Sequence, residues 1–330
     1  MTRILGVHID ILASLFSICS SASCMMSDDS DDLRPITVPV EYITTPYGYV
    51  HPDCIQTVDE DEMVQIDGVT PHIAQQPDGS DPRDLTACTH PRFDSEGAIV
   101  SDDETAPSEE MNLTNEEPDT SPGGSNWFES ADSKKIGAVS YMHAQWNIPS
   151  APKSRRGQRV YFFPGLVNSK LRATTILQPV LGWNQADSNI EGWSLASWNC
   201  CKKGKVHHSK FIPAPGSMVS GDIIGLDCNN GICSKWRVVS YDWTSHRSTT
   251  LNTTAFGLKM NWIFGGVLEA PGVRKCNQFP PDPVTFSDFI INDSDGRHVS
   301  TPSWNKTFWR HRPDCDFHIS SSGDRVTLHY

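Results

Sequence analysis

After its first 24 residues, the sequence has no apolar run approaching the about 18 residues that a membrane-spanning helix needs, so we expect no membrane partner. It also lacks a convincing helical periodicity, a nucleophile elbow, a phosphate-binding glycine loop, an HExxH motif and a CxxC pair. These absences exclude the commonest signatures of hydrolases, nucleotide-binding proteins and zinc sites. The sequence therefore predicts no cofactor and no metal, and the pair His207-His208 fits a solvated basic turn better than a metal site.

Basic residues are scarce in the first part of the chain. Residues 1–133 hold 27 Asp and Glu but four Lys and Arg, a balance of −23, whereas residues 134–330 hold 13 and 23, a balance of +10. An acidic segment thus precedes a basic domain. The segment either stays disordered as a solubilising tail or folds back on the domain as an electrostatic partner. We expect no nucleic-acid partner, because the basic residues are scattered and the chain has features of an exported protein.

Export is indicated by the N-terminus and by the cysteines. Residues 1–24 read as a signal peptide, with Arg3, a short apolar run at 11–18 and small residues at 20–24. Eight cysteines remain, an even number that favours disulfides; Cys54–Cys88 and Cys228–Cys233 are candidate pairs, the second around a turn. Four glycosylation sequons begin at Asn112, Asn252, Asn292 and Asn305. We therefore expect a secreted, disulfide-bonded glycoprotein.

The remaining chain divides into two regions. Residues 25–133 form the acidic N-terminal segment, with a small structured island at about 35–54 and a linker at 101–125. Residues 134–330 carry many short β-rich runs separated by turn residues, among them 138–146, 159–163, 175–183, 193–198, 236–243, 259–264 and 284–291. This pattern predicts an all-β fold, an antiparallel two-sheet sandwich, with a bulge at Gly265-Gly266.

The order of several short motifs resembles that of the glutamic peptidases, the eqolisins. The motifs are Ala144-Gln-Trp-Asn-Ile-Pro149, Tyr161-Phe-Phe-Pro-Gly-Leu166, Ile176-Leu-Gln178, Trp193-Ser-Leu-Ala-Ser-Trp-Asn199, Val219-Ser-Gly-Asp222 and Asn261-Trp-Ile-Phe264. The resemblance covers roughly residues 138–270. It implies a concanavalin-like sandwich of the eqolisin type, with a groove on the concave face of one sheet.

The resemblance also implies a catalytic dyad. Gln178 matches the glutamine that stabilises the oxyanion, and Asn261 stands where the family has the glutamate that activates water. We expect the two side chains to face each other in the groove. An amide cannot serve as a general base, so Asn261 argues against activity. Glu269 lies too far along the chain to replace the glutamate; Asp187 and Glu191 follow the Gln178 run and are the other candidates.

The groove should be lined by aromatic residues, and Trp183, Trp193, Trp198 and Trp262 are the candidates. In a regular strand Trp193 and Trp198 point to opposite faces, so one of them should be exposed in the groove and the other buried in the core. Three functions stay open. The chain is a catalytically degenerate protein that binds extended peptide or polysaccharide, an active acid endopeptidase, or a structural protein of the extracellular space or cell wall.

Overall fold

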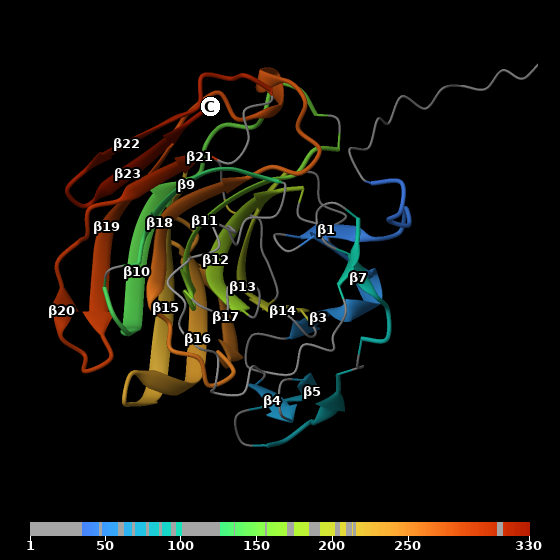
Figure 1. The fold of residues 1–330 in the computed structure, drawn as a ribbon, viewed down its shortest axis with the longest axis vertical. Coiled ribbons are helices and arrows are strands. Elements are labelled where there is room, and N and C mark those ends of the chain that lie inside the picture. The colour runs from blue at the N-terminus through green and yellow to red at the C-terminus, as the bar shows by residue number, and fades with distance from the viewer. Residues whose placement is uncertain are drawn as a thin grey trace, which may run out of the picture. The chain divides into compact units, whose positions relative to one another are not determined.

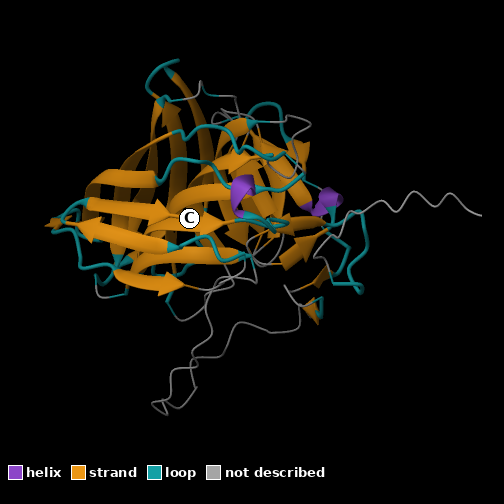
Figure 2. Ribbon diagram, turned by 90° about the horizontal axis from the view of Figure 1, so that it is seen from above, coloured by secondary structure: helices purple, strands orange, loops and turns teal. Residues whose placement is uncertain are grey.

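The computed structural model describes residues 35–45, 48–58, 63–67, 70–76, 79–85, 88–93, 97–100, 126–134, 136–155, 157–169, 175–184, 192–201, 205–208, 213, 216–308 and 313–330. Regular structure in these ranges is almost entirely β, and the two helices are short 3-10 turns, η1 (Pro52–Cys54) and η2 (Cys276–Gln278) (Figure 2). No helix in this part of the chain is long and apolar enough to cross a membrane. The predicted signal peptide and the linker at 101–125 lie outside the described residues.

Two large sheets make up the sandwich (Figure 1). The eight-stranded sheet has the order β21 (Asn305–Phe308), β9 (Trp127–Ser133), β18 (Trp262–Glu269), β11 (Val160–Val167), β12 (Thr175–Trp183), β13 (Trp193–Cys201), β14 (Lys205–His208) and β3 (Ile55–Val58). Residues His207 and His208, for which the sequence predicts a turn, therefore lie in a strand.

The eleven-stranded sheet has the order β22 (His318–Ser322), β23 (Arg325–His329), β19 (Val284–Asp293), β10 (Val139–Asn147), β15 (Met218–Asn229), β16 (Ile232–Asp242), β17 (Arg247–Thr253), β4 (Met63–Asp67), β5 (Thr70–Gln75) and β6 (Arg83–Asp84), and β20 (His298–Val299) pairs with β19. All described strand pairs of both sheets are antiparallel except β14–β3 and β17–β4. The predicted all-β, antiparallel two-sheet sandwich is confirmed.

A third, four-stranded sheet is built from the N-terminal segment. Its order is β1 (Ile43–Thr45), β2 (Gly48–Val50), β7 (Arg92–Phe93) and β8 (Ile99–Val100). A small cluster of its own, Val38, Tyr42, Tyr49 and Phe93, is buried here. The predicted structured island is thus present among the described residues and extends to Val100.

The sandwich also begins earlier than the predicted boundary at residue 134. Strand β9, which precedes that boundary, pairs with β18 on one side and β21 on the other, so it is an interior strand of the eight-stranded sheet. Strands β3 and β4 come from further upstream and extend one sheet each. The acidic segment therefore contributes strands to the sandwich sheets.

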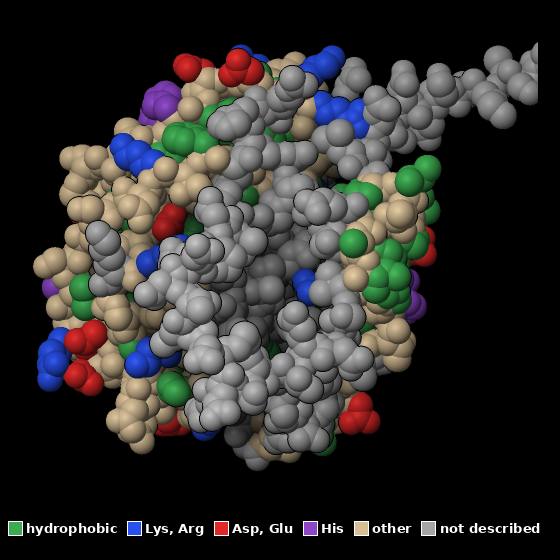
Figure 3. Space-filling model, viewed as in Figure 1, with side chains coloured by type: hydrophobic (Ala, Val, Ile, Leu, Met, Phe, Trp, Pro, Cys, Tyr) green, Lys and Arg blue, Asp and Glu red, His purple; other side chains and the backbone are tan. Residues whose placement is uncertain are grey.

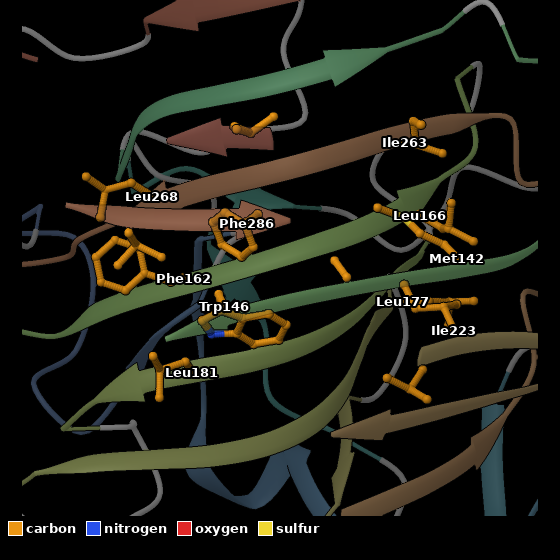
Figure 4. Close-up of a cluster of buried hydrophobic side chains, with 14 of the residues drawn as sticks. Met142, Trp146, Phe162, Leu166, Leu177, Leu181, Ile223, Ile263, Leu268 and Phe286 are labelled. Atoms are coloured by element: carbon orange, nitrogen blue, oxygen red, sulfur yellow. The ribbon is translucent and has the colours of Figure 1, made fainter. Parts of the chain in front are cut away.

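The main core lies between the two sheets. Figure 4 shows side chains of the two sheets meeting in this core, with Phe162 beside Trp146 and Phe286 at one end and Leu177 beside Met142 and Ile223 at the other. Each of these residues is almost completely buried. The alternation of inward and outward side chains along the strands follows from the two-residue period of β structure.

Polar side chains join the two sheets where β13 faces β16 and β17. Ser197 Oγ lies 3.1 Å from Ser240 Oγ and donates to the Thr249 carbonyl at 2.9 Å. Asn199 Nδ2 donates to Thr253 Oγ1 at 2.8 Å. These buried groups are hydrogen-bonded, which offsets the cost of removing them from water.

Three disulfides lie within the described residues. Cys54–Cys88 and Cys228–Cys233 confirm the pairs proposed from the sequence, the second closing the β15–β16 hairpin. The third, Cys276–Cys315, joins η2 to the segment before β22.

Candidate functional site

Gln178 lies on the outer face of the eight-stranded sheet, the face opposite the inter-sheet core. In β12, Leu177 and Leu181 belong to the core between the sheets, whereas Ile176 and Val180 belong to a second buried cluster. Gln178 has the parity of this second cluster, because alternate residues of a strand share a face. We call this surface the Gln178 face; its apolar members are Trp127, Tyr161, Phe163, Val167, Ile176, Val180, Ala196, Trp198, Cys200, Trp262, Phe264 and Val267.

The predicted tryptophans divide between the two faces. Trp198 and Trp262 lie on the Gln178 face, 5% and 2% exposed. Trp183 and Trp193 belong to the core between the sheets, with their rings 5.3 Å apart, and so are not groove residues. The prediction that Trp193 and Trp198 face opposite sides is confirmed, and the core position belongs to Trp193.

The strand register gives the neighbours of Gln178 across the sheet. Gln178 pairs with Trp198 of β13, and the β11–β12 register places Gly165 opposite it on the other side. Gly165 pairs with Phe264 of β18, which pairs in turn with Asp132 of β9. We call these residues, which lie opposite one another across the sheet, the Gln178 row. The row has an aromatic residue on each side of Gln178 and a carboxylate, Asp132, at its β9 end.

Asn261 does not lie on this row. It is three residues before Phe264, the residue of β18 that occupies the Gln178 row. Its Oδ1 atom accepts a hydrogen bond from the backbone N–H of Ser169 at 2.9 Å, and its own N–H donates to the Val167 carbonyl. At about 3.3 Å per residue and about 4.8 Å per strand, Asn261 is about 14 Å from Gln178 along the sheet. The expectation that the two side chains face each other is not met by this register.

The amide of Gln178 is 1% exposed, and its Oε1 atom accepts no hydrogen bond within the described part of the chain. An unsatisfied buried carbonyl oxygen costs about 1–3 kcal/mol, so a donor brought to this position would bind favourably. The backbone N–H of a bound peptide can donate this hydrogen bond to Gln178 Oε1.

Asp132 is a buried carboxylate on the same face. Trp262 Nε1 donates to its Oδ1 at 3.0 Å, and Thr307 Oγ1 donates to its Oδ2 at 3.3 Å. Burial raises the pKa of Asp132 above its ordinary value, although these hydrogen bonds and the charge of Lys134 oppose the shift. The Lys134 ammonium also lies 4.4 Å from the Trp262 ring centroid, a cation–π contact.

Neither described carboxylate of the face is within reach of Gln178. Asp132 is three strands away, about 14 Å at the usual strand spacing. Glu269 pairs with Tyr161, which pairs with Gly182, four residues beyond Gln178, so it is about 16 Å away. A water shared by an amide and a carboxylate needs both within about 3 Å of it. The other candidates, Asp187 and Glu191, lie outside the described residues.

Two glycines of β18 lie against the inter-sheet core. The register shifts between Phe264 and Gly266, which confirms the predicted bulge. A Cβ atom on Gly265 would lie 2.7 Å from the Trp304 ring, and one on Gly266 would lie 2.7 Å from Phe286. Both positions therefore require glycine for close packing against the core.

A second polar constellation, which the sequence did not reveal, lies on the outer face of the eleven-stranded sheet. Asp222 Oδ1 accepts from the Tyr141 hydroxyl at 2.6 Å and lies 2.8 Å from His143 Nδ1. Gln145 Nε2 is 3.3 Å from His143 Nε2. Burial raises the pKa of Asp222, but the hydrogen bonds from His143 and Tyr141 outweigh it and leave the pKa below its ordinary value. The alternation Tyr141-x-His143-x-Gln145 was the available signal.

Charged groups do not gather on the face of the molecule seen in Figure 3. The coloured Lys, Arg, Asp and Glu side chains lie in small groups of both signs. The absence of a nucleic-acid partner stays a prediction, since this view covers one side of the described residues.

Comparisons with known proteins return similarity in structure only. No protein-family model matches the chain, and no curated protein matches it in sequence. A crystal structure of scytalidoglutamic peptidase with a peptide-based transition-state analogue is 17% identical, with a TM-score of 0.45, over 62% of this chain and 98% of that one. SCP-B, a member of the eqolisin family in complex with the tripeptide Ala-Ile-His, is 18% identical, with a TM-score of 0.44 and the same coverage. A congerin II mutant is 8% identical, with a TM-score of 0.26, over 44% of this chain and 93% of that one. These similarities assign no activity to the chain.

Proposed function

We propose that this chain is a secreted, catalytically inactive protein with a glutamic-peptidase-like sandwich, which binds an extended peptide segment along the Gln178 face. The observation that carries the proposal is the row across the sheet: Gln178 has Trp198 and Phe264 near it, and no described carboxylate within water-bridging distance. The face thus has an amide and aromatic surface for binding but has no carboxylate within reach of Gln178 among the described residues.

An extended peptide fits the chemistry of this face. Its backbone N–H can donate to the Gln178 Oε1 atom, and its apolar side chains can pack on Trp198 and Trp262. A polysaccharide would need several polar groups to pair with its hydroxyls, and the residues that make up this face are mainly apolar. Peptide is therefore the preferred ligand and polysaccharide the alternative that the test must separate.

The Gln178 face is buried in this structure, so a ligand can reach it only after a cover moves away. We propose that the acidic segment upstream of β9 is this cover, held by the attraction between its Asp and Glu side chains and the +10 balance of residues 134–330. Protonation of Asp and Glu below about pH 4 would weaken the attraction and open the face. The acidic segment would in this way make binding of a ligand to the Gln178 face depend on pH.

The hydrolysis arm of the test uses denatured protein substrates incubated with the purified chain from acid to neutral pH. The expected result is no cleavage above that of the Gln178→Ala variant. Cleavage by the wild-type chain that disappears in Gln178→Ala would show that a base exists outside the described residues and would overturn the proposal.

The binding arm follows tryptophan fluorescence while extended apolar peptides, or oligosaccharides of similar length, are added at about pH 3.5, below the usual pKa of the carboxylates. We expect saturable binding of peptides and about tenfold weaker binding in Gln178→Ala, from the loss of one hydrogen bond. Binding of oligosaccharides alone, or equal peptide binding by both proteins, would contradict the assignment of the face.

The cover is tested by a protease site inserted between residues 101 and 125 of the full chain. After cleavage, the two parts should stay together at about pH 7 and low salt and associate more weakly at about pH 3.5, where the carboxylates are protonated and only contacts such as the backbone pairing of β3 and β4 remain. Equal association at both pH values would show that ionised carboxylates do not hold the segment.

A further inference from the structure

Two histidines and a carboxylate meet in the N-terminal segment, beside the four-stranded sheet. Asp53 Oδ2 lies 3.4 Å from His51 Nδ1 and 3.4 Å from His90 Nε2. The three ligand atoms all lie within 4.8 Å of one another. Within the described residues, no other group of three metal-type side chains comes this close together.

A covalent frame holds the three residues in place. His51 is the N-cap of η1, which contains Asp53 and Cys54, and the Cys54–Cys88 disulfide brings the segment that carries His90 alongside. The His51 ring also contacts the edge of Tyr42, at a centroid distance of 5.4 Å. The disulfide and the neighbouring small core therefore bring together the backbone segments that carry the three side chains.

His51 Nδ1, the ring nitrogen that faces Asp53, lies close to two groups of that residue. It is 3.2 Å from the Asp53 backbone nitrogen and 3.4 Å from the Asp53 Oδ2 atom. An imidazole nitrogen has one lone pair, so a metal bound at Nδ1 would replace the hydrogen bond from the Asp53 N–H. Asp53 Oδ2 would then be the second ligand of the same ion.

The distances suit a small tetrahedral ion. With Zn–N of about 2.0–2.1 Å and Zn–O of about 2.0–2.2 Å, adjacent ligand atoms of a tetrahedral site lie about 3.4 Å apart. Two edges of the triangle already have this length. We propose that His51, Asp53 and His90 bind a Zn²⁺ ion or a similar first-row divalent metal, with water in the fourth position.

The ligand set and its exposure give the class of the ion. Two imidazoles and a carboxylate suit zinc and its neighbours rather than Ca²⁺ or Mg²⁺, which take oxygen ligands. The His51 and His90 rings are stacked, with centroids 3.5 Å apart and planes 12° apart, so one ring must turn to share the ion. The His51, His90 and Asp53 side chains are 17%, 38% and 70% exposed, which leaves the ion a path from solvent.

The test titrates the chelator-treated full chain with Zn²⁺ in competition with a chromophoric chelator. We expect one Zn²⁺ per chain, and binding weakened by at least about tenfold in Asp53→Asn and in His90→Ala, because each loses a ligand. Co²⁺ in place of Zn²⁺ should give the intense visible bands of a tetrahedral ion in the wild-type chain and weak bands in both variants.

The matched control is the other stacked histidine pair, His318 and His329, whose rings are 4.0 Å apart and which belongs to no three-ligand group in the described chain. The double variant His318→Ala/His329→Ala should keep full Zn²⁺ binding. Peptide mapping without reductant checks that each variant keeps the Cys54–Cys88 bond. Absence of Zn²⁺ binding in the wild-type chain, or equal binding in His90→Ala with the disulfide intact, would overturn the proposal.

Discussion

Replacement of Glu129 by glutamine should make the protein more stable at neutral pH. Glu129 pairs with Leu268, a residue of the inter-sheet core, and is completely buried. Its two carboxylate oxygens accept no hydrogen bond from the described residues. Burial raises the pKa of Glu129 from 4.5 to about 9, so the folded chain keeps this proton across the neutral range.

The sign of the effect follows from proton linkage. A group with a pKa raised by folding contributes its full stability below the unfolded value of 4.5, and this contribution is lost as the pH rises toward about 9. The loss is about 1.4 kcal/mol per pH unit, or about 3 kcal/mol between about pH 4.5 and pH 7. A glutamine side chain at this position does not titrate, so the variant should lack this slope.

The assay is urea unfolding of both proteins, with the disulfides intact, at several values between about pH 4.5 and pH 8. The difference in the free energy of unfolding between Glu129→Gln and wild type should increase by about 1.4 kcal/mol for each pH unit. The exposed Glu41 supplies the control, since Glu41→Gln makes the same change of side chain at the surface. Parallel curves for Glu129→Gln and wild type would refute the reasoning.

Further predictions concern packing, the second polar constellation and the dyad. Gly221→Ala should lower the free energy of unfolding by about 1–3 kcal/mol in the same urea assay, because the new methyl group would overlap the Pro179 ring. Gly165→Ala is its control: the new methyl group would make contacts of 3.4 Å, so the free energy of unfolding should fall by less. Asp222→Asn should cost about 1–3 kcal/mol at pH 7, and this difference should shrink below about pH 4, because the lowered pKa of Asp222 gives stability that is lost as the carboxylate protonates. Asn261→Glu should remain inactive on denatured protein substrates, because residue 261 lies off the Gln178 row; a gain of activity would show that the motif alignment, and not the strand register, places the dyad.

The fold class could be predicted because short β-rich runs alternate with turn residues, and this local pattern does not depend on distant contacts. The hairpin disulfide Cys228–Cys233 could be predicted because its two cysteines lie on either side of a turn, which is also a local signal. The opposite orientation of Trp193 and Trp198 followed from strand periodicity, but periodicity does not say which face is the core. Which face of a strand is the core depends on where the second sheet packs. Trp183 and Trp193 were therefore assigned to the groove, although they belong to the core.

The composition of each site could not be predicted, because it depends on register between strands far apart in the sequence. Asp132 reaches the Gln178 row through β9, which the predicted domain boundary had excluded. Asp222 ends one of the motifs that carry the family resemblance, but its pairing with His143 in the middle of a sheet depends on the register of two strands far apart in the sequence. The ligands of the proposed metal site are separated by the chain between Asp53 and His90, and no short motif describes them.

The two parallel pairings of the N-terminal segment have a consequence for the solubility of the protein. Strand β3 lies beyond β14, and β4 lies beyond β17, so upstream residues occupy what would otherwise be a free edge of each sandwich sheet. An uncovered edge presents a row of unpaired N–H and C=O groups, which other chains can extend into intermolecular sheets. Loss of the residues upstream of β9 would therefore leave two such edges at once, and the shortened chain should self-associate through its strands.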